Sequence, residues 1–144
     1  MIQLLVALCY LLAVICNLFL ILFAYVTVHN INEFITDKTN PIEICEVLNL
    51  VILPEYIAHA VSTFLFIISW QVFSIIINIP LLVYHIYMYV TRPMASIRGI
   101  YDPTTILQGS KMQSIRRISW MKFGFYLIMF CYYCYSLIYT LVQT

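Results

Sequence analysis

The sequence has few charged residues, and this scarcity decides its class. Asp, Glu, Lys and Arg make up 9% of the 144 residues, whereas hydrophobic residues make up 64%. A soluble domain carries about a quarter charged residues, so this composition indicates an integral membrane protein. The net charge of +1 gives no basic field of the kind that nucleic acids require, and we expect no nucleic-acid partner.

The N-terminus lacks the basic residues of a cleaved leader. No Lys or Arg precedes the first apolar run, and Tyr25 and Val26 follow Ala24 where a signal peptide would have small residues. A secretory signal begins with a basic segment and has a shorter apolar region than this one. We therefore expect residues 4–28 to form a retained membrane span.

Patterns of catalytic and metal-binding residues are also missing. The five cysteines fit neither a disulfide framework nor a zinc site. Glu55 and His59 are four residues apart and share a helix face, but no H-E-x-x-H or G-x-S-x-G pattern accompanies them. We predict a polar pair that fixes helix register at the membrane boundary. The sequence predicts no enzyme, no cofactor and no metal site, and an intramembrane enzyme that uses this pair is the alternative.

The longest hydrophobic block, residues 51–90, contains one acid, Glu55, and no Lys or Arg. As one helix it would be roughly 60 Å long, about twice the hydrocarbon thickness of a bilayer. Trp70 and Gln71 lie near its middle, and Trp favours the headgroup level. We predict a hairpin of two spans, 53–69 and 71–90, with Pro54 in the first turn of the first span and a kink at Pro80 in the second.

Two polar segments flank this block. Within residues 29–52, Asn40 is suited to cap a helix, Pro41 to its first turn, and Glu43 follows three residues after the cap. We expect a short interfacial helix there that leads into the next span. Residues 91–119 form the most basic segment, and residues 120–142 form the last span.

The basic residues predict the orientation, because Lys and Arg mark the cytosolic side. Loops 29–52 and 91–119 would then both be cytosolic and both termini luminal or extracellular. The predicted fold is a single all-α membrane domain, residues 1–144, with four transmembrane helices and a central hairpin. If the central block crosses only once, the protein has three spans and segment 29–50 is luminal.

Polar side chains inside the first and last spans are candidates for contacts with other helices. Asn17 lies in the first span, and Tyr132, Tyr135 and Tyr139 share a face of the last span. Such groups need hydrogen-bond partners in hydrocarbon. We predict that they dock client helices. Packing within the protein is the alternative, with an interfacial belt as a further one for Tyr139.

Several motifs, taken together and in order, resemble the cornichon family of endoplasmic reticulum export receptors. They extend over nearly the whole chain and include Asp37-Lys38-Thr39-Asn40-Pro41-Ile42, Leu53-Pro54-Glu55-Tyr56 with His59, Asn78-Ile79-Pro80-Leu81-Leu82-Val83-Tyr84-His85, Arg92-Pro93, Tyr101-Asp102-Pro103-Thr104-Thr105-Ile106, Lys122-Phe123-Gly124-Phe125-Tyr126 and Tyr132-Tyr133.

The resemblance implies a transmembrane cargo receptor that selects membrane-protein clients for COPII vesicles and cycles between the endoplasmic reticulum and the Golgi. Its partners would be client spans, coat components and membrane lipids, and self-association remains open. The family's coat contact follows Asp102, which implies a site at Ile106, Leu107, Gln108, Gly109 and Ser110.

Some animal members of the family act as auxiliary subunits of AMPA-type glutamate receptors, and these resemble one another in an insertion within the first polar loop. In this chain the loop runs from Asn40-Pro41 to Leu53-Pro54 without that insertion. The resemblance is therefore greater to the general export branch, with a channel subunit as the alternative.

Overall fold

The structure, a computed structural model, describes residues 2–37, 40–91 and 109–143, and every regular element in these ranges is an α-helix. The helices are α1 (Ile2–Asp37), α2 (Pro41–Ile68), α3 (Val72–Val90) and α5 (Gly109–Gln143). All four are long and apolar enough to cross a membrane. The prediction of an all-α membrane protein with four candidate spans is confirmed.

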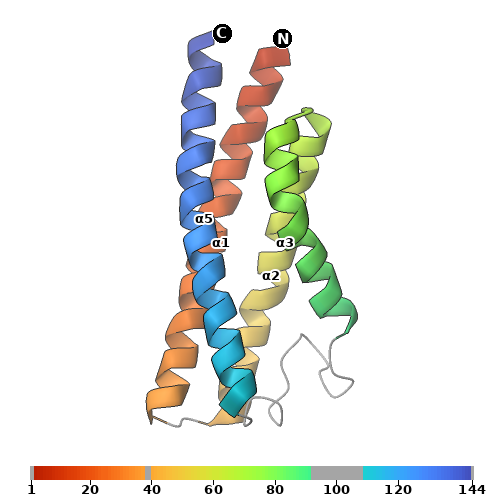
Figure 1. Ribbon diagram of the computed structural model, residues 1–144. Helices are drawn as coiled ribbons and strands as arrows, with labels where there is room; N and C mark the ends of the chain where they lie inside the picture. The colour runs from red at the N-terminus through yellow and green to blue at the C-terminus, as the bar shows by residue number, and fades with distance from the viewer. Residues whose placement is uncertain (1, 38–39, 92–108, 144) are drawn as a thin grey trace.

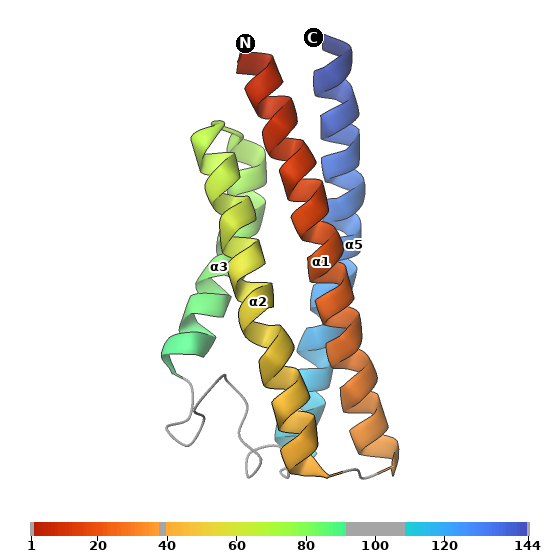
Figure 2. The same cartoon turned by 180° about the vertical axis from the view of Figure 1, so that it is seen from behind.

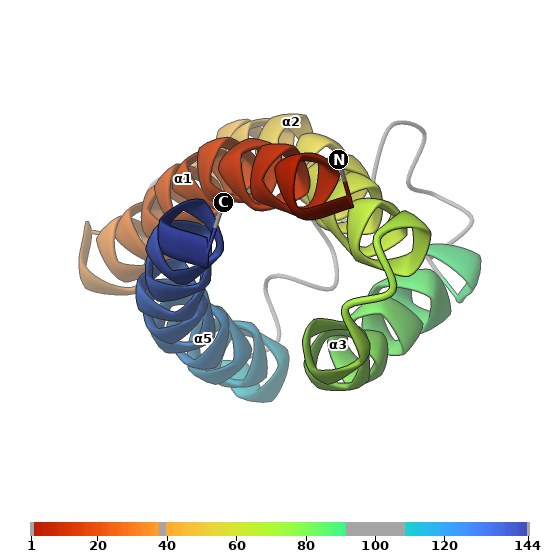
Figure 3. The same cartoon turned by 90° about the horizontal axis from the view of Figure 1, so that it is seen from above.

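The helices form an open bundle in which α1 is central. It packs against both α5 and α2, and α2 packs in turn against α3 (Figures 1 and 2). Viewed along the bundle, the four helices follow an arc with α5 and α3 at its two ends (Figure 3). The chain begins and ends at the same end of the bundle (Figure 1), as four crossings require.

The first two helices extend further than the sequence suggested. α1 continues past Val28 to Asp37, and α2 begins at Pro41, so most of segment 29–52 is helical. The predicted cap is confirmed, because the Asn40 side chain accepts a hydrogen bond from the Ile42 amide at 3.0 Å. The separate interfacial helix is wrong, because α2 runs unbroken to Ile68.

Pro54 accordingly lies inside α2 and not in a first turn. A proline within a helix removes one backbone donor, here the one that would bond to the Leu50 carbonyl. The helix continues on both sides of Pro54, and its other backbone hydrogen bonds keep α2 intact despite that loss. Pro80 lies inside α3 as predicted, and α3 is visibly bent in Figures 1 and 2.

The predicted hairpin turn is present at Ser69 and Trp70. The Gln71 amide donates to the Phe66 carbonyl at 3.0 Å, and the Trp70 amide donates to the Ile67 carbonyl at 3.3 Å. This pair of bonds is the Schellman arrangement, whose central residue adopts a left-handed conformation and is usually Gly. Trp70 takes that place with φ 58°, so the turn forms without glycine.

The interior of the bundle is built on small residues of α1. Ala13 and Ala24 are buried and let neighbouring helices approach closely, which is how helices pack in membranes. Ala13 lies in a cluster with Phe66 and Met129, and Ala24 in a cluster with Tyr126. These contacts join α1 to α2 and α5 and position the polar residues described next.

Candidate functional site

A buried ion pair joins α2 to α5. The Lys122 ammonium lies 2.9 Å from Glu55 Oε2, and the Tyr126 hydroxyl donates to the same oxygen at 3.1 Å. Glu55 is 1% exposed and Lys122 8% exposed. A charge within a membrane bundle needs such a partner, because an isolated one costs several kcal/mol. The pair therefore fixes how the central hairpin docks on α5.

Aromatic rings enclose the Lys122 ammonium. It lies 5.0 Å from the centroid of the Tyr56 ring and 5.7 Å from that of Tyr84. Contacts of this kind between a cation and a ring contribute about 0.5–2 kcal/mol each. Tyr56 also stacks on His85, with ring centroids 4.1 Å apart. The ion pair is thus shielded by residues of α2 and α3.

His85 is the least satisfied member of this group. Its Nε2 lies 3.6 Å from Glu55 Oε2, too far for a hydrogen bond. Neither ring nitrogen has a hydrogen-bond partner among the described residues, although the side chain is 2% exposed. The His85 ring also meets the His59 ring edge to face, with ring centroids 5.1 Å apart.

His59 begins a second polar group, centred on Asn78 of α3. His59 Nε2 and Asn78 Oδ1 are 3.0 Å apart. The Asn78 amide donates to the Ser74 carbonyl and to the Tyr133 hydroxyl, both at 2.8 Å. One buried amide therefore joins α2, α3 and α5.

Tyr10 extends this group to α1 and to the hairpin turn. Its hydroxyl donates to Gln71 Oε1 at 3.1 Å and lies 3.1 Å from Ser74 Oγ. The side-chain amide of Gln71 in turn donates from Nε2 to the Ser69 carbonyl at 3.1 Å. We call the two groups together the polar core: Glu55, Lys122, Tyr126, His85, His59, Asn78, Tyr133, Ser74, Tyr10 and Gln71.

The polar core shows what Glu55 and His59 bond to. They share a face of α2, and each bonds to a different helix, Glu55 to α5 and His59 to α3. Both are buried within α2, and their position at the membrane boundary stays a prediction. The Glu55 carboxylate is already held by Lys122 and Tyr126. No cluster of three metal-ligating side chains occurs within the described ranges.

Asn17 does not fit the predicted role in client docking. It is 2% exposed, and its amide donates to the Tyr126 carbonyl at 2.7 Å. The alternative of packing within the protein holds for this residue, which ties α1 to α5.

The three tyrosines of α5 separate into two environments. Tyr132 is half-buried and packs on Phe73, with ring centroids 5.4 Å apart. Tyr135 and Tyr139 are 68% and 56% exposed and stack on each other with centroids 6.3 Å apart. Only the outer two tyrosines are available to another protein's span.

The remaining predicted positions fall largely outside the described ranges. This holds for Tyr101, Asp102 and Pro103 of the family motif and for Ile106, Leu107 and Gln108 of the expected coat contact. Gly109 and Ser110 begin α5.

Sequence reasoning missed most of the polar core. Lys122, Tyr126 and His85 enter the sequence analysis only as residues of the family motifs, and Tyr10 does not enter it. One signal could have found the ion pair: a single acid in a long apolar block needs a basic partner inside the membrane, and Lys122 is a basic residue next to an apolar span.

Comparison with known proteins places these features in a family. The pattern of the family described as cornichon protein matches residues 7–135. The chain is 57% identical to protein cornichon homolog 1 of Caenorhabditis elegans over 138 residues, covering 96% of this chain and 95% of the relative. It is 44% identical to protein cornichon of Drosophila melanogaster, with 94% of each covered. It is 31% identical to protein cornichon homolog 3 of Mus musculus, with 96% of each covered. The chain belongs to the cornichon family.

Proposed function

We propose that this protein is a transmembrane cargo receptor that selects membrane-protein clients for COPII vesicles travelling from the endoplasmic reticulum to the Golgi. The route follows from the resemblance of its motifs to the cornichon export receptors. The observation that carries the docking mechanism is the exposed, stacked pair Tyr135 and Tyr139 on α5.

The polar core leaves the outer faces of the bundle for recognition. Its main hydrogen bonds run between helices, and His85, which has no hydrogen-bond partner among the described residues, is buried. The outward face of α1 is instead apolar over residues 4–22, with exposed residues that include Leu4, Leu8, Leu11, Ile15, Leu18 and Leu22. A client span would pack on this apolar surface, and the tyrosine hydroxyls would select spans that carry a polar partner.

Two weak contacts would then act together. The client binds in the plane of the membrane, and the loops at the end of the bundle where α5 begins bind the coat. Because one protein holds both, each partner raises the effective concentration of the other. No chemical step is required of the receptor.

The client surface is tested by replacing both Tyr135 and Tyr139 with Ala. We expect client capture and client packaging in a vesicle-budding assay to fall together, while the variant itself still enters vesicles. The matched control is Tyr87→Ala, which removes an exposed tyrosine from α3 (61% exposed). Equal client capture by the double variant and by Tyr87→Ala would show that α5 is not the docking face.

The coat contact is tested separately by replacing Ile106 and Leu107 with Ala. We expect client binding to persist while client export slows, because only the cytosolic contact is lost. Unchanged export kinetics would contradict this site.

An auxiliary channel subunit is the rival function, and one observation weighs against it. The alignment with the mouse relative extends over 154 positions, whereas this chain has 144 residues, so that relative carries residues that this chain lacks. On co-expression with an AMPA-type receptor, we expect no change in deactivation kinetics; slower deactivation would favour the rival.

A further inference from the structure

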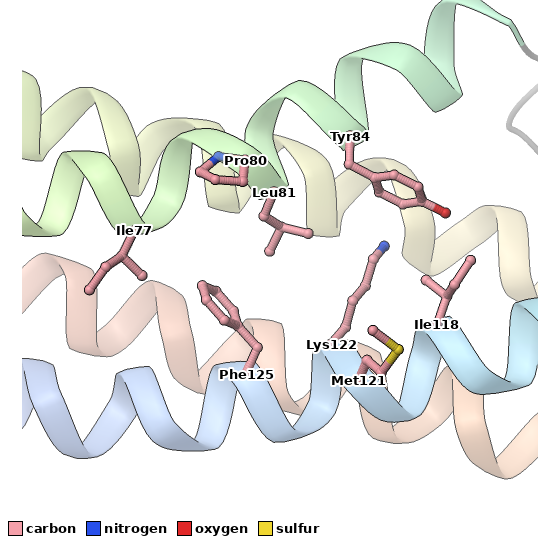
Figure 4. Close-up of a pocket in the computed structure, with 8 residues that line it drawn as sticks. All are labelled: Ile77, Pro80, Leu81, Tyr84, Ile118, Met121, Lys122 and Phe125. Carbon is pink, nitrogen blue, oxygen red and sulfur yellow. The ribbon is translucent and has the colours of Figure 1, made fainter.

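A cavity of about 400 Å³ lies between α3 and α5 (Figure 4). All of its lining residues come from these two helices, whose backbones are not close neighbours in the described part of the chain and which meet through side chains such as Asn78 with Tyr133 and Phe73 with Tyr132. Figure 3 shows α3 and α5 at the two ends of the arc of helices, and the cavity is lined from both of these helices. Of its lining residues, Pro80 is exposed and Met121 is 66% exposed, so the cavity opens toward the surrounding lipid.

The lining changes in character along the cavity. Ile77 and Phe125 lie at one end, whereas Tyr84 and Lys122 lie toward the other, nearer the start of α5 (Figure 4). The Lys122 ammonium is held by Glu55, so this end is polar without an unpaired charge. An apolar channel with polar groups at one end suits an amphiphile.

The dimensions suit one hydrocarbon chain. A volume of about 400 Å³ holds roughly a dozen methylene groups if each takes about the volume of a water molecule. Ile77 and Tyr84 are seven positions apart, which corresponds to about 10 Å along the helix axis.

Basic residues continue the same face of α5 beyond the polar end. Arg117 is exposed and lies four residues before Met121, and Lys111 is exposed and lies seven residues before Ile118. Lys111 therefore lies on the side of Ile118 and Arg117 on the side of Met121, so the two basic residues flank the cavity face of α5, about 9 Å apart along the helix axis. Basic residues at a membrane boundary attract anionic lipid headgroups, and their segment is the one that the charge distribution assigns to the cytosolic side.

We propose that this cavity binds one acyl chain of an anionic phospholipid, whose phosphate lies against Arg117 and Lys111. The lipid enters sideways between α3 and α5, with its chain along the apolar lining and its headgroup at the level of the first turns of α5. This site is separate from the client surface at Tyr135 and Tyr139 and does not depend on the proposed export function.

The test uses the full chain in nanodiscs of phosphatidylcholine that contain a small fraction of a probe lipid. The probe is phosphatidylserine with a photoreactive diazirine in one acyl chain, and phosphatidylcholine with the same chain is the comparison. After illumination, mass spectrometry locates the adducts. We expect them to concentrate on residues 77–84 and 118–125, with a several-fold higher yield for phosphatidylserine.

Substitutions separate the cavity from lipid that merely surrounds the bundle. Met121→Trp fills the cavity and should lower the adduct yield several-fold, and Ile118→Phe is a second filling variant. The matched control is Ile128→Trp, seven residues further along α5, 70% exposed and outside the cavity, which should keep the yield. Arg117→Gln combined with Lys111→Gln should reduce the phosphatidylserine yield to that of phosphatidylcholine.

Two outcomes would overturn the proposal. Adducts spread evenly over the outer surface, with equal yields in Met121→Trp, Ile118→Phe and Ile128→Trp, would mean surrounding lipid only. Equal yields for the two probes in the unmodified protein would show that the site has no preference for an anionic headgroup. Size-exclusion profiles of the variants establish that each remains folded before illumination.

Discussion

The pair of Glu55 and Lys122 allows a quantitative prediction about the bundle's stability. At a separation of 2.9 Å, Coulomb's law with an effective dielectric constant of 20 gives an attraction of about 6 kcal/mol. The cost of removing both charges from water offsets much of it, and a buried pair is often no more stable than apolar residues of the same volume. Removing only one partner, however, leaves the other buried and uncompensated.

We therefore expect strong asymmetry between single and double variants. Lys122→Met should lower the free energy of unfolding by about 3–5 kcal/mol, and Glu55→Gln by a similar amount. The double variant should lie within about 1 kcal/mol of the unmodified protein, because no charge remains unpaired. In a thermal scan, each single loss corresponds to a decrease in Tm on the order of 10 °C.

The measurement is a double-mutant cycle on the protein in detergent micelles, with unfolding followed by a thiol-reactive dye or by circular dichroism. Lys111→Met is the control, because Lys111 is exposed on the same helix and its loss should cost less than about 0.5 kcal/mol. If the two single variants each lose less than about 1 kcal/mol and their losses add up in the double variant, the ion pair does not hold α2 on α5.

Three further predictions concern the rest of the bundle. Asn78→Leu breaks bonds to α2 and α5 and should cost about 1–3 kcal/mol in the same unfolding assay. Asn30→Leu removes a side-chain amide that bonds to the Val26 carbonyl of its own helix and should be close to neutral; equal losses in the two variants would refute the bridging role of Asn78. Trp70→Gly should be about 1 kcal/mol more stable than Trp70→Ala, because only glycine adopts the left-handed backbone conformation without strain. Equal stabilities of the two variants would show that the backbone at this position is not strained. A glycosylation tag inserted after Ser69 should be modified and one inserted after Lys38 should not, and the reverse result would invert the predicted orientation.

The presence of four membrane-spanning α-helices could be predicted from the sequence, because each helix follows from local rules. Chain length against bilayer thickness divides the central block into two spans, and Asn40 and Pro41 are residue types preferred at the cap and in the first turn of a helix. The errors arose where tertiary context overrides a local signal. Pro54 was expected to begin a helix, yet α2 extends through it, because the bonded and packed residues on both sides offset the cost of about 3 kcal/mol that a proline has inside a helix.

The polar core was not predictable in the same way. Glu55 and Lys122 are 67 positions apart, and nothing local to either residue names the other. Asn17 shows the same limit, since its sequence context fits a buried bond to the Tyr126 carbonyl as well as an outward contact. Which polar residues pair inside a bundle depends on how the helices rotate and dock, and a single sequence does not specify this.

The polar core also bears on how recognition and stability are divided in this protein. Apolar side chains alone would let the hairpin of α2 and α3 slide or rotate on α1 and α5, because lipid contacts are as favourable as helix contacts. Glu55 can meet Lys122 in one register only, and Asn78 can meet Tyr133 only in that same register. The polar groups thus act inside the bundle, where they fix its register, and recognition of clients is left to the outward faces. It follows that substitutions in the polar core should affect all clients equally, through folding, whereas substitutions at Tyr135 and Tyr139 should affect some clients more than others at unchanged stability. A variant of Asn78 that selectively loses one client while unfolding normally would contradict this division.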